Sequence, residues 1–161
     1  MITTVLLTEK TLSAHDVARM ASLHGDDEVR VHVVIPAHGD FGGVEEAVDD
    51  IAKTHFRDAL HDEDAESSPQ QLSSRAHEEL AATVAALQSA GLSSVDGEVV
   101  PKHPVDAVVA LAEQLGADEV VVFTEPHLVA DLTRRDWATR LRHKLHLPVL
   151  HVVLGTDQVV G

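Results

Sequence analysis

The segment from Lys102 to Phe123 constrains the fold of this chain more than any other part of its sequence. Pro104 opens a stretch in which apolar residues recur at helical spacing, and Gly116 ends it. Val120–Phe123 follows as an unbroken apolar run, which is typical of a parallel strand covered on both faces. The segment is therefore half of a β-α-β unit. In sheets of this kind ligands bind beyond the carboxyl ends of the strands, so a site is expected just after Phe123.

Four further segments have the composition of strands, and helical patterns separate them. Strands are expected at residues 3–7, 29–35, 95–100, 120–123 and 149–153. This alternation predicts a single α/β domain over residues 1–161, with helices on both faces of a five-stranded parallel sheet in the order 3-2-1-4-5. The first and fourth strands then flank a crevice, whose mouth is expected to be lined by Thr8, Glu9, Thr124 and Glu125.

The helices between these strands have recognisable boundaries. Ser13 with Asp16 forms a capping-box pattern before the first helix. Helical spacing of apolar residues predicts further helices at 44–55 and from Leu72 up to a stop at Gly91. Residues 61–70 are acidic and lack apolar periodicity, so a mobile loop is expected there.

The composition excludes several classes of function. The formal net charge of -15 argues against general binding to nucleic acid or to an anionic membrane. Because there is no cysteine, disulfides, thiolate metal sites and cysteine nucleophiles are excluded. The sequence has no basic leader and no apolar run near the roughly 20 residues of a membrane span, so a cytoplasmic protein is expected.

Histidine is frequent, with 12 residues, and a metal site has to be considered. His55, His61, Asp62 and Asp64 lie close together in the sequence. A regular helix does not place residues six positions apart on one face, so these side chains are not expected to converge. We therefore expect scattered surface histidines and no metal site.

Three motifs resemble the universal stress protein family. Residues 102–108 (KHPVDAV) are similar to the family's Gly-Asp-Pro-x-x-x-Ile turn, and residues 116–122 (GADEVVV) to its Ala-Asp-hydrophobic strand. Residues 141–143 and 148–153 look like its closing helix and strand. Their order and spacing extend the resemblance over nearly the whole chain, which implies the adenine nucleotide alpha hydrolase-like fold of that family.

The chain departs from the family at the phosphate loop. Nucleotide-binding members carry Gly-x-x-Gly-x9-Gly-(Ser/Thr) after strand four, and the corresponding positions here are Thr124, His127, Trp137 and Ala138. Side chains with a Cβ block the close backbone approach and the positive φ angles that glycine permits. No bound cofactor is therefore expected, and in particular no ATP held in the family's usual manner.

Glu9 corresponds by this resemblance to the acidic residue that follows strand one in the family, although Lys10 replaces the next glycine. Glu9 either contacts a ribose hydroxyl or is an ordinary solvated carboxylate, and we favour the second interpretation. If Glu9 and Glu125 both point into the crevice, their like charges oppose a triphosphate.

Arg134 and Arg135 support an alternative. The segment between His127 and Pro148 holds five basic residues against two acidic ones. Guanidinium groups near the start of a helix can hold a phosphate without glycines. The alternative function is therefore a stress sensor that binds ATP or AMP through an arginine-based site, with His127 as a polar neighbour of the crevice.

Catalysis is not expected. The chain has neither a Gly-x-Ser-x-Gly nucleophile elbow nor a Walker loop. His103 and His127 are candidate bases, yet sequence spacing identifies no partner for either. The leading hypothesis is a non-catalytic, stress-related module that binds a partner or a small ligand.

The last strand predicts a partner surface. An apolar strand at the edge of a sheet needs a cover, and pairing with a second copy is one way to supply it. The resemblance to universal stress proteins implies the same contact, because members commonly dimerise through their last strands. We therefore expect a homodimer with antiparallel contact through Val149, Leu150, His151, Val152 and Val153.

Overall fold

The computed structural model describes residues 1–37, 69–125 and 135–160. Strands and helices alternate along these ranges, as the sequence predicts. In chain order the elements are β1 (Ile2–Thr8), α1 (Ala14–Ser22), β2 (Val29–Pro36), α4 (Pro69–Ser89), β3 (Ser94–Val100), α5 (Pro104–Leu115), β4 (Glu119–Thr124), α6 (Arg135–Lys144), β5 (Val149–Val153) and β6 (Val159–Val160).

The sheet has the strand order β3-β2-β1-β4-β5-β6. All pairings from β3 to β5 are parallel, which confirms the predicted parallel sheet in the order 3-2-1-4-5. The reversal of order places β1 beside β4, and Thr8 is level with Phe123 in their register. The carboxyl ends of these two strands therefore meet at the same edge of the sheet.

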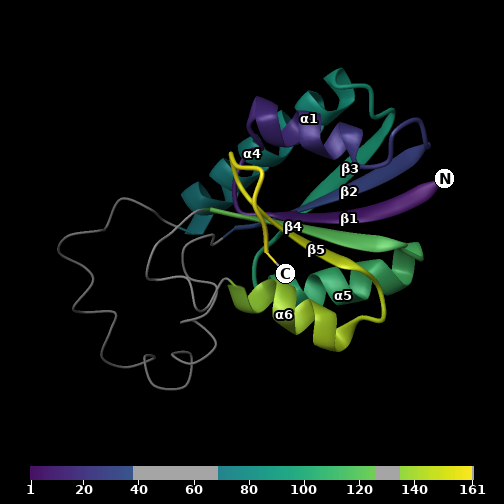
Figure 1. The fold of residues 1–161 in the computed structure, drawn as a ribbon. Coiled ribbons are helices and arrows are strands. Elements are labelled where there is room, and N and C mark those ends of the chain that lie inside the picture. Colours follow the sequence, from purple (N-terminus) through teal and green to yellow (C-terminus); the bar gives the residue numbers. More distant parts are fainter. Residues whose placement is uncertain (38–68, 126–134, 161) are drawn as a thin grey trace, which may run out of the picture.

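Helices cover both faces of the sheet, with α1 and α4 on one side and α5 and α6 on the other (Figure 1). The strands supply both cores because successive side chains point to opposite faces. Leu6 packs with residues of α1 and α4, whereas its neighbours Val5 and Leu7 pack with residues of α5 and α6. The three-layer arrangement predicted from the unbroken apolar strands is confirmed.

Local signals set the helix ends. Ser13 accepts from the backbone N–H of Asp16 and forms the predicted capping box at the start of α1. Helix α5 has Pro104 in its first turn and Gly116 as its C-cap, at φ 62°. Glycine suits that position because it adopts left-handed angles without steric cost.

Helix α4 begins earlier than expected. The acidic segment was expected to be a loop through Gln70, but Pro69 and Gln70 already belong to the helix. Proline is favourable in a first turn, where its missing N–H would have no intrahelical acceptor. The rest of the loop, the expected helix at 44–55 and the cluster of His55, His61, Asp62 and Asp64 lie outside the described residues.

The expectation that 149–153 forms the sheet edge is wrong. The described sheet has a sixth strand, and β6 pairs antiparallel with the outer side of β5. The sequence after Val153 contains Gly155, whose φ of 71° lets the chain turn back. The expected homodimer through β5 is untested, and the free edge on which it was based is covered at His151 and Val152.

Within the described ranges, every helix is too short or too polar to cross a bilayer.

Candidate functional site

A pocket of about 80 Å³ lies beyond the carboxyl ends of β1, β2 and β4, where α4 crosses them. Its floor and walls come from four separate segments of the chain. The lining residues are Glu9, Lys10, Pro36, Ala37, Leu72, Arg75, Ala76, Glu79 and Glu125. Glu9 and Glu125 therefore line the crevice, as the sequence predicts.

Glu9 is buried, with 4% of its surface exposed. Its backbone N–H donates to the carbonyl oxygen of Phe123 at 3.4 Å, which extends the contact between β1 and β4 by one residue. Its Oε2 accepts a hydrogen bond of 3.2 Å from the backbone N–H of Glu125. The interpretation of Glu9 as an ordinary solvated carboxylate is wrong, because Glu9 spans the two strand ends.

Lys10 compensates one of the two acidic charges that the sequence places here. Its Nζ lies 2.5 Å from Oε1 of Glu125. The hydroxyl of Thr8 donates to the carbonyl oxygen of Lys10 at 2.8 Å and holds the turn after β1. The expected like-charge repulsion between Glu9 and Glu125 is therefore moderated by a cation that the sequence analysis treated only as the residue replacing glycine.

Helix α4 adds a second charged pair to the pocket. Nε of Arg75 lies 3.5 Å from Oε1 of Glu79, at the i,i+4 spacing that suits an ion pair on a helix. Burial raises the pKa of Glu79 above its ordinary value of 4.5, and the charge of Glu125 raises it further. Arg75 and Lys10 oppose this shift in the pKa of Glu79 without cancelling it.

The sequence analysis missed the residues that α4 contributes. Leu72, Arg75, Ala76 and Glu79 follow helical spacing and share one face of the helix. Charged residues among the apolar positions of one helix face, such as Arg75 and Glu79 here, could have indicated that α4 contributes to a site. What the sequence lacked was the position of this face over the ends of β1 and β2.

Thr8 and Thr124, which were expected at the mouth of the crevice, are not among the residues that line this pocket. Both are buried. The Thr124 hydroxyl lies 2.7 Å from Nε2 of His151, a buried residue of β5. Thr124 on β4 is therefore in contact with the neighbouring strand β5. Its side chain lies on the same face of the sheet as Val122, opposite the face covered by α4.

The positions that replace the second half of the phosphate loop are only partly described. His127 and Arg134 lie outside the described residues, and of Arg135 only its place at the start of α6 is given. Trp137 and Ala138 are each 1% exposed and belong to the sheet-facing side of α6. The position at which the resemblance leads us to expect the third glycine is thus held by Trp137, a core residue.

Metal ligands do not converge in residues 1–37, 69–125 and 135–160, where no three histidine or carboxylate side chains form a possible site. The charged groups of the pocket are instead arranged as two cation–carboxylate pairs plus Glu9. Such an arrangement offers hydrogen-bond donors and acceptors to a small polar molecule. Among its described lining residues, no nucleophile lies beside a base.

Comparisons with known proteins agree on the fold. No family model matches the sequence, and no curated protein is similar to it at the sequence level. A solved structure of the universal stress protein from Archaeoglobus fulgidus in complex with dAMP is similar, with 18% identity, 96% of this chain and 97% of that chain covered, and a TM-score of 0.56. A universal stress protein in complex with cAMP aligns with 16% identity, 96% and 98% coverage, and a TM-score of 0.57.

A plant structure extends the likeness beyond archaea. A universal stress protein family protein from Arabidopsis thaliana with AMP bound is similar, with 12% identity and a TM-score of 0.52. The alignment covers 96% of this chain and 94% of that chain. Identities at this level establish the arrangement of the backbone. This chain has the fold of the universal stress proteins.

Proposed function

We propose that this protein is a non-catalytic binding module that takes a small polar ligand in the pocket between Glu9 and Glu79, and that it does not bind ATP in the manner that the family resemblance of its sequence implies. The observation that carries this proposal is the hydrogen bond from the backbone N–H of Glu125 to the carboxylate of Glu9. The first amide beyond β4 already donates to a carboxylate of the protein itself. A phosphate at that place would compete with this carboxylate and be repelled by it.

The nature of the ligand follows from the groups around the pocket. Three carboxylates, from Glu9, Glu79 and Glu125, face two cations, from Lys10 and Arg75. Pro36, Ala37, Leu72 and Ala76 form the apolar part of the wall. A zwitterionic molecule suits this mixture, since its cationic end pairs with a carboxylate and its anionic end with Lys10 or Arg75.

The size of the pocket supports a small ligand. At about 80 Å³ it has room for several water molecules, since each occupies roughly 10–15 Å³ by this measure. Drug-sized ligands use pockets of roughly 300–1,000 Å³. The described pocket is therefore better matched to a molecule of amino-acid size than to a complete nucleoside triphosphate.

An alternative function is that of a nucleotide-binding sensor, which the relatives solved with dAMP, cAMP and AMP favour. Arg134 and Arg135 would then replace the glycines in holding a phosphate. The raised pKa of Glu79 bears on both functions, because perturbed carboxylates in a pocket often belong to binding sites.

Titration followed by NMR separates these functions. The probes are ATP, AMP, cAMP and adenosine on one side, and a panel of zwitterionic amino acids, diamines and dicarboxylates on the other. We expect zwitterions to shift the amide resonances of Lys10, Ala76 and Glu125, and ATP to leave them unchanged at millimolar concentration. Nucleotide-induced shifts that Arg134→Ala abolishes would establish the alternative, and no shift with any probe would refute both.

A charge-matched pair of variants tests the role of Glu9. Glu9→Ala releases the Glu125 amide and removes a negative charge from the pocket, so weak ATP binding is expected to appear. Glu113→Ala removes the same charge from an exposed position on α5 and is expected to have no effect. Release of phosphate from ATP by the unmodified chain, measured over hours, would contradict the non-catalytic part of the proposal.

A further inference from the structure

The C-terminal segment folds back along the outer side of β5. Val159 is paired with Val152 and Val160 with His151 in antiparallel register. The backbone N–H of Val153 also donates to the carbonyl oxygen of Gln158 at 3.1 Å. The segment therefore covers β5 from His151 to its end, and β6 is the outermost strand of the described sheet.

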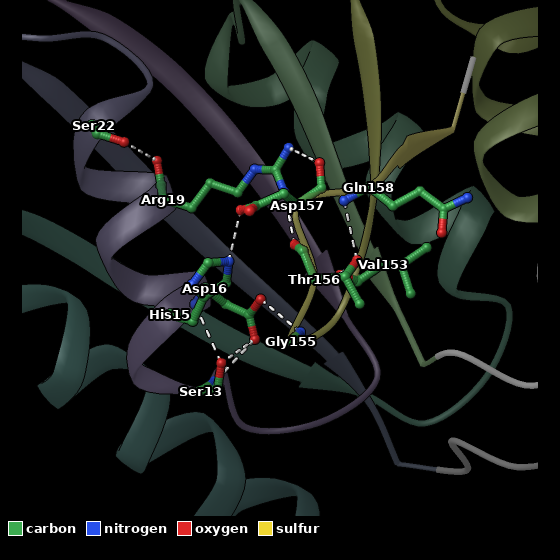
Figure 2. Close-up of polar contacts among 10 residues, drawn as sticks. All are labelled: Ser13, His15, Asp16, Arg19, Ser22, Val153, Gly155, Thr156, Asp157 and Gln158. Carbon is green, nitrogen blue, oxygen red and sulfur yellow. Dashed lines mark hydrogen bonds and ion pairs between the residues drawn. The ribbon is translucent and has the colours of Figure 1, made fainter.

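Helix α1 holds the turn between β5 and β6 through a buried carboxylate (Figure 2). Oδ1 of Asp16 accepts a hydrogen bond of 2.9 Å from the backbone N–H of Gly155. Oδ2 of Asp16 accepts from the hydroxyl of Ser13 at 2.6 Å and from its backbone N–H at 3.1 Å. Asp16 is fully buried, so the carboxylate that accepts these bonds is shielded from water, although Gly155 itself is exposed.

Arg19, one turn further along α1, binds the next two carbonyl groups of the turn. One terminal nitrogen donates to the carbonyl oxygen of Thr156 at 2.8 Å, and the other donates to that of Asp157 at 3.0 Å. His15 adds a contact of 2.8 Å between its Nε2 and Oδ1 of Asp157 at the exposed rim. Figure 2 shows these side chains of α1 directed toward the turn from one side.

Together these contacts engage backbone groups of Gly155, Thr156 and Asp157 with side chains of a helix that is far away in the sequence. A turn that only reversed the chain would not need them. A segment that must remain on the edge of a sheet does need an anchor, because two paired residues are too few to hold a strand in place.

We infer that the C-terminal segment 155–160, anchored to α1 by Asp16 and Arg19, is a built-in cap that prevents β5 from pairing with a second copy of this chain. Backbone groups of β5 that pair with β6 are not available to another strand. When β6 leaves, the edge of β5 becomes a row of unpaired donors and acceptors.

The partner of the uncovered edge is a second copy because antiparallel pairing of one strand with itself is self-complementary. A two-fold axis brings the same surface of both molecules together, and no other protein is required. The composition of β5 supports this, since three of its five residues are valine, a residue favoured in strands. The inference is independent of the proposed ligand.

Substitutions in the full chain test the cap. Val159→Pro combined with Val160→Pro removes both backbone N–H groups of β6, so the strand loses its ladder donors. Val159→Thr combined with Val160→Thr keeps these donors and the β-branched shape and is the matched control. The oligomeric state is measured by light scattering on a size-exclusion column, with the fluorescence of the single tryptophan, Trp137, as the check of folding.

The unmodified chain and the threonine control are expected to have a mass of 17.3 kDa over the micromolar range, and the proline variant twice that mass. A folded proline variant that stays monomeric would overturn the inference. So would an unmodified chain of twice the monomer mass whose Val153 amide is protected from hydrogen exchange, because β6 and a second copy would then coexist.

A second variant decides the matter if the proline variant does not fold. Arg19→Ala removes the donors that hold Thr156 and Asp157, and Lys102→Ala removes one positive charge from an exposed loop as its control. Arg19→Ala is expected to accelerate hydrogen exchange at Val153 and Gly155 and to produce dimers at high concentration. Accelerated exchange without any dimer would contradict the cap, and so would unchanged exchange.

Discussion

The carboxylate of Asp16 and the backbone N–H of Gly155 are joined by a hydrogen bond of 2.9 Å across 139 positions of sequence. The same carboxylate completes the capping box of α1 through Ser13. One buried side chain therefore both starts the first helix and anchors the last turn. This double use makes Asp16 a sensitive position for stability.

Replacement of Asp16 by alanine is expected to destabilise the protein by about 2–4 kcal/mol. The variant keeps Ser13 as the N-cap but loses the reciprocal half of the capping box, and it leaves the backbone N–H groups of Ser13 and Gly155 without their carboxylate acceptor. Chemical denaturation followed through Trp137 fluorescence measures the change. Asp26→Ala, which removes the same charge from an exposed loop, should stay within about 0.5 kcal/mol. A similar loss in both variants would show that net charge and not the hydrogen bonds is responsible.

Trp137 stands where the family resemblance of the sequence predicts a glycine of the phosphate loop, and it belongs to the core formed with α5. Trp137→Ala is expected to cost about 3–5 kcal/mol, because a large buried side chain is removed from between α6 and the sheet. Trp137→Gly restores the residue type of the nucleotide binders, yet it should lose stability without gaining ATP affinity. Thermal unfolding with and without ATP checks both statements. A Trp137→Gly variant that ATP stabilises would show that the indole alone blocks the phosphate.

Gly97 on β3 is packed closely against both the neighbouring strand β2 and helix α4. A Cβ built there would lie 2.6 Å from the carbonyl oxygen of Val33 and 2.7 Å from Cδ1 of Leu80. Gly97→Ala is therefore expected to destabilise by about 1–3 kcal/mol, as overpacking does elsewhere. In a background of Leu80→Ala one clash disappears, but the clash with the Val33 carbonyl remains. Urea denaturation of the four chains of this double-mutant cycle should give a loss for Gly97→Ala in both backgrounds, and no loss in either would contradict the packing described.

The pKa of Glu79 gives a prediction about pH. Because burial raises its pKa in the folded state above the ordinary 4.5, the folded protein holds this proton more tightly than the unfolded chain does. The stabilising contribution of protonated Glu79 is fully present below pH 4.5 and is lost as the pH rises through the folded-state pKa. As the pH rises from 4.5 through the folded-state pKa of Glu79, the wild-type chain should therefore lose free energy of unfolding relative to the Glu79→Gln variant.

Urea unfolding of both chains at a series of pH values measures this difference, and the titration of the other carboxylates, common to both, largely cancels. A wild-type chain that gains stability relative to Glu79→Gln as the pH rises would mean that Arg75 and Lys10 outweigh burial. Arg75→Met, which removes the nearest cation, should make the pH-dependent loss larger.

Whether a structural feature could be predicted from the sequence depends on how far apart in the chain the residues that determine it lie. The strand at Val120–Phe123, the capping box at Ser13 and the stop at Gly116 were predictable because each is set by neighbouring residues. The order of the strands followed from the alternation of elements and from the handedness of crossovers between parallel strands. These rules need no knowledge of individual side chains.

The site was less predictable. Glu9 and Glu125 were placed correctly at the crevice, but Glu9 is buried and accepts a hydrogen bond from a residue 116 positions away. Lys10 was considered only as a replacement for glycine, whereas its charge neutralises Glu125. Thr8 and Thr124 were expected at the mouth from their position after the strands. The Thr8 hydroxyl instead donates to the carbonyl oxygen of Lys10, and alternation along β4 places Thr124 on the face opposite α4.

By itself the sequence determined a parallel α/β sheet with helices on both faces, because hydrophobic periodicity and turn residues act within one element and its neighbours. Only the tertiary structure decided that β6 covers β5, that α4 brings Arg75 and Glu79 over the strand ends, and that Asp16 reaches Gly155. The physical reason is that such contacts join segments that are far apart in the chain, and no local sequence pattern indicates which distant residues will meet. Their partners are fixed only when the sheet and its helices have packed.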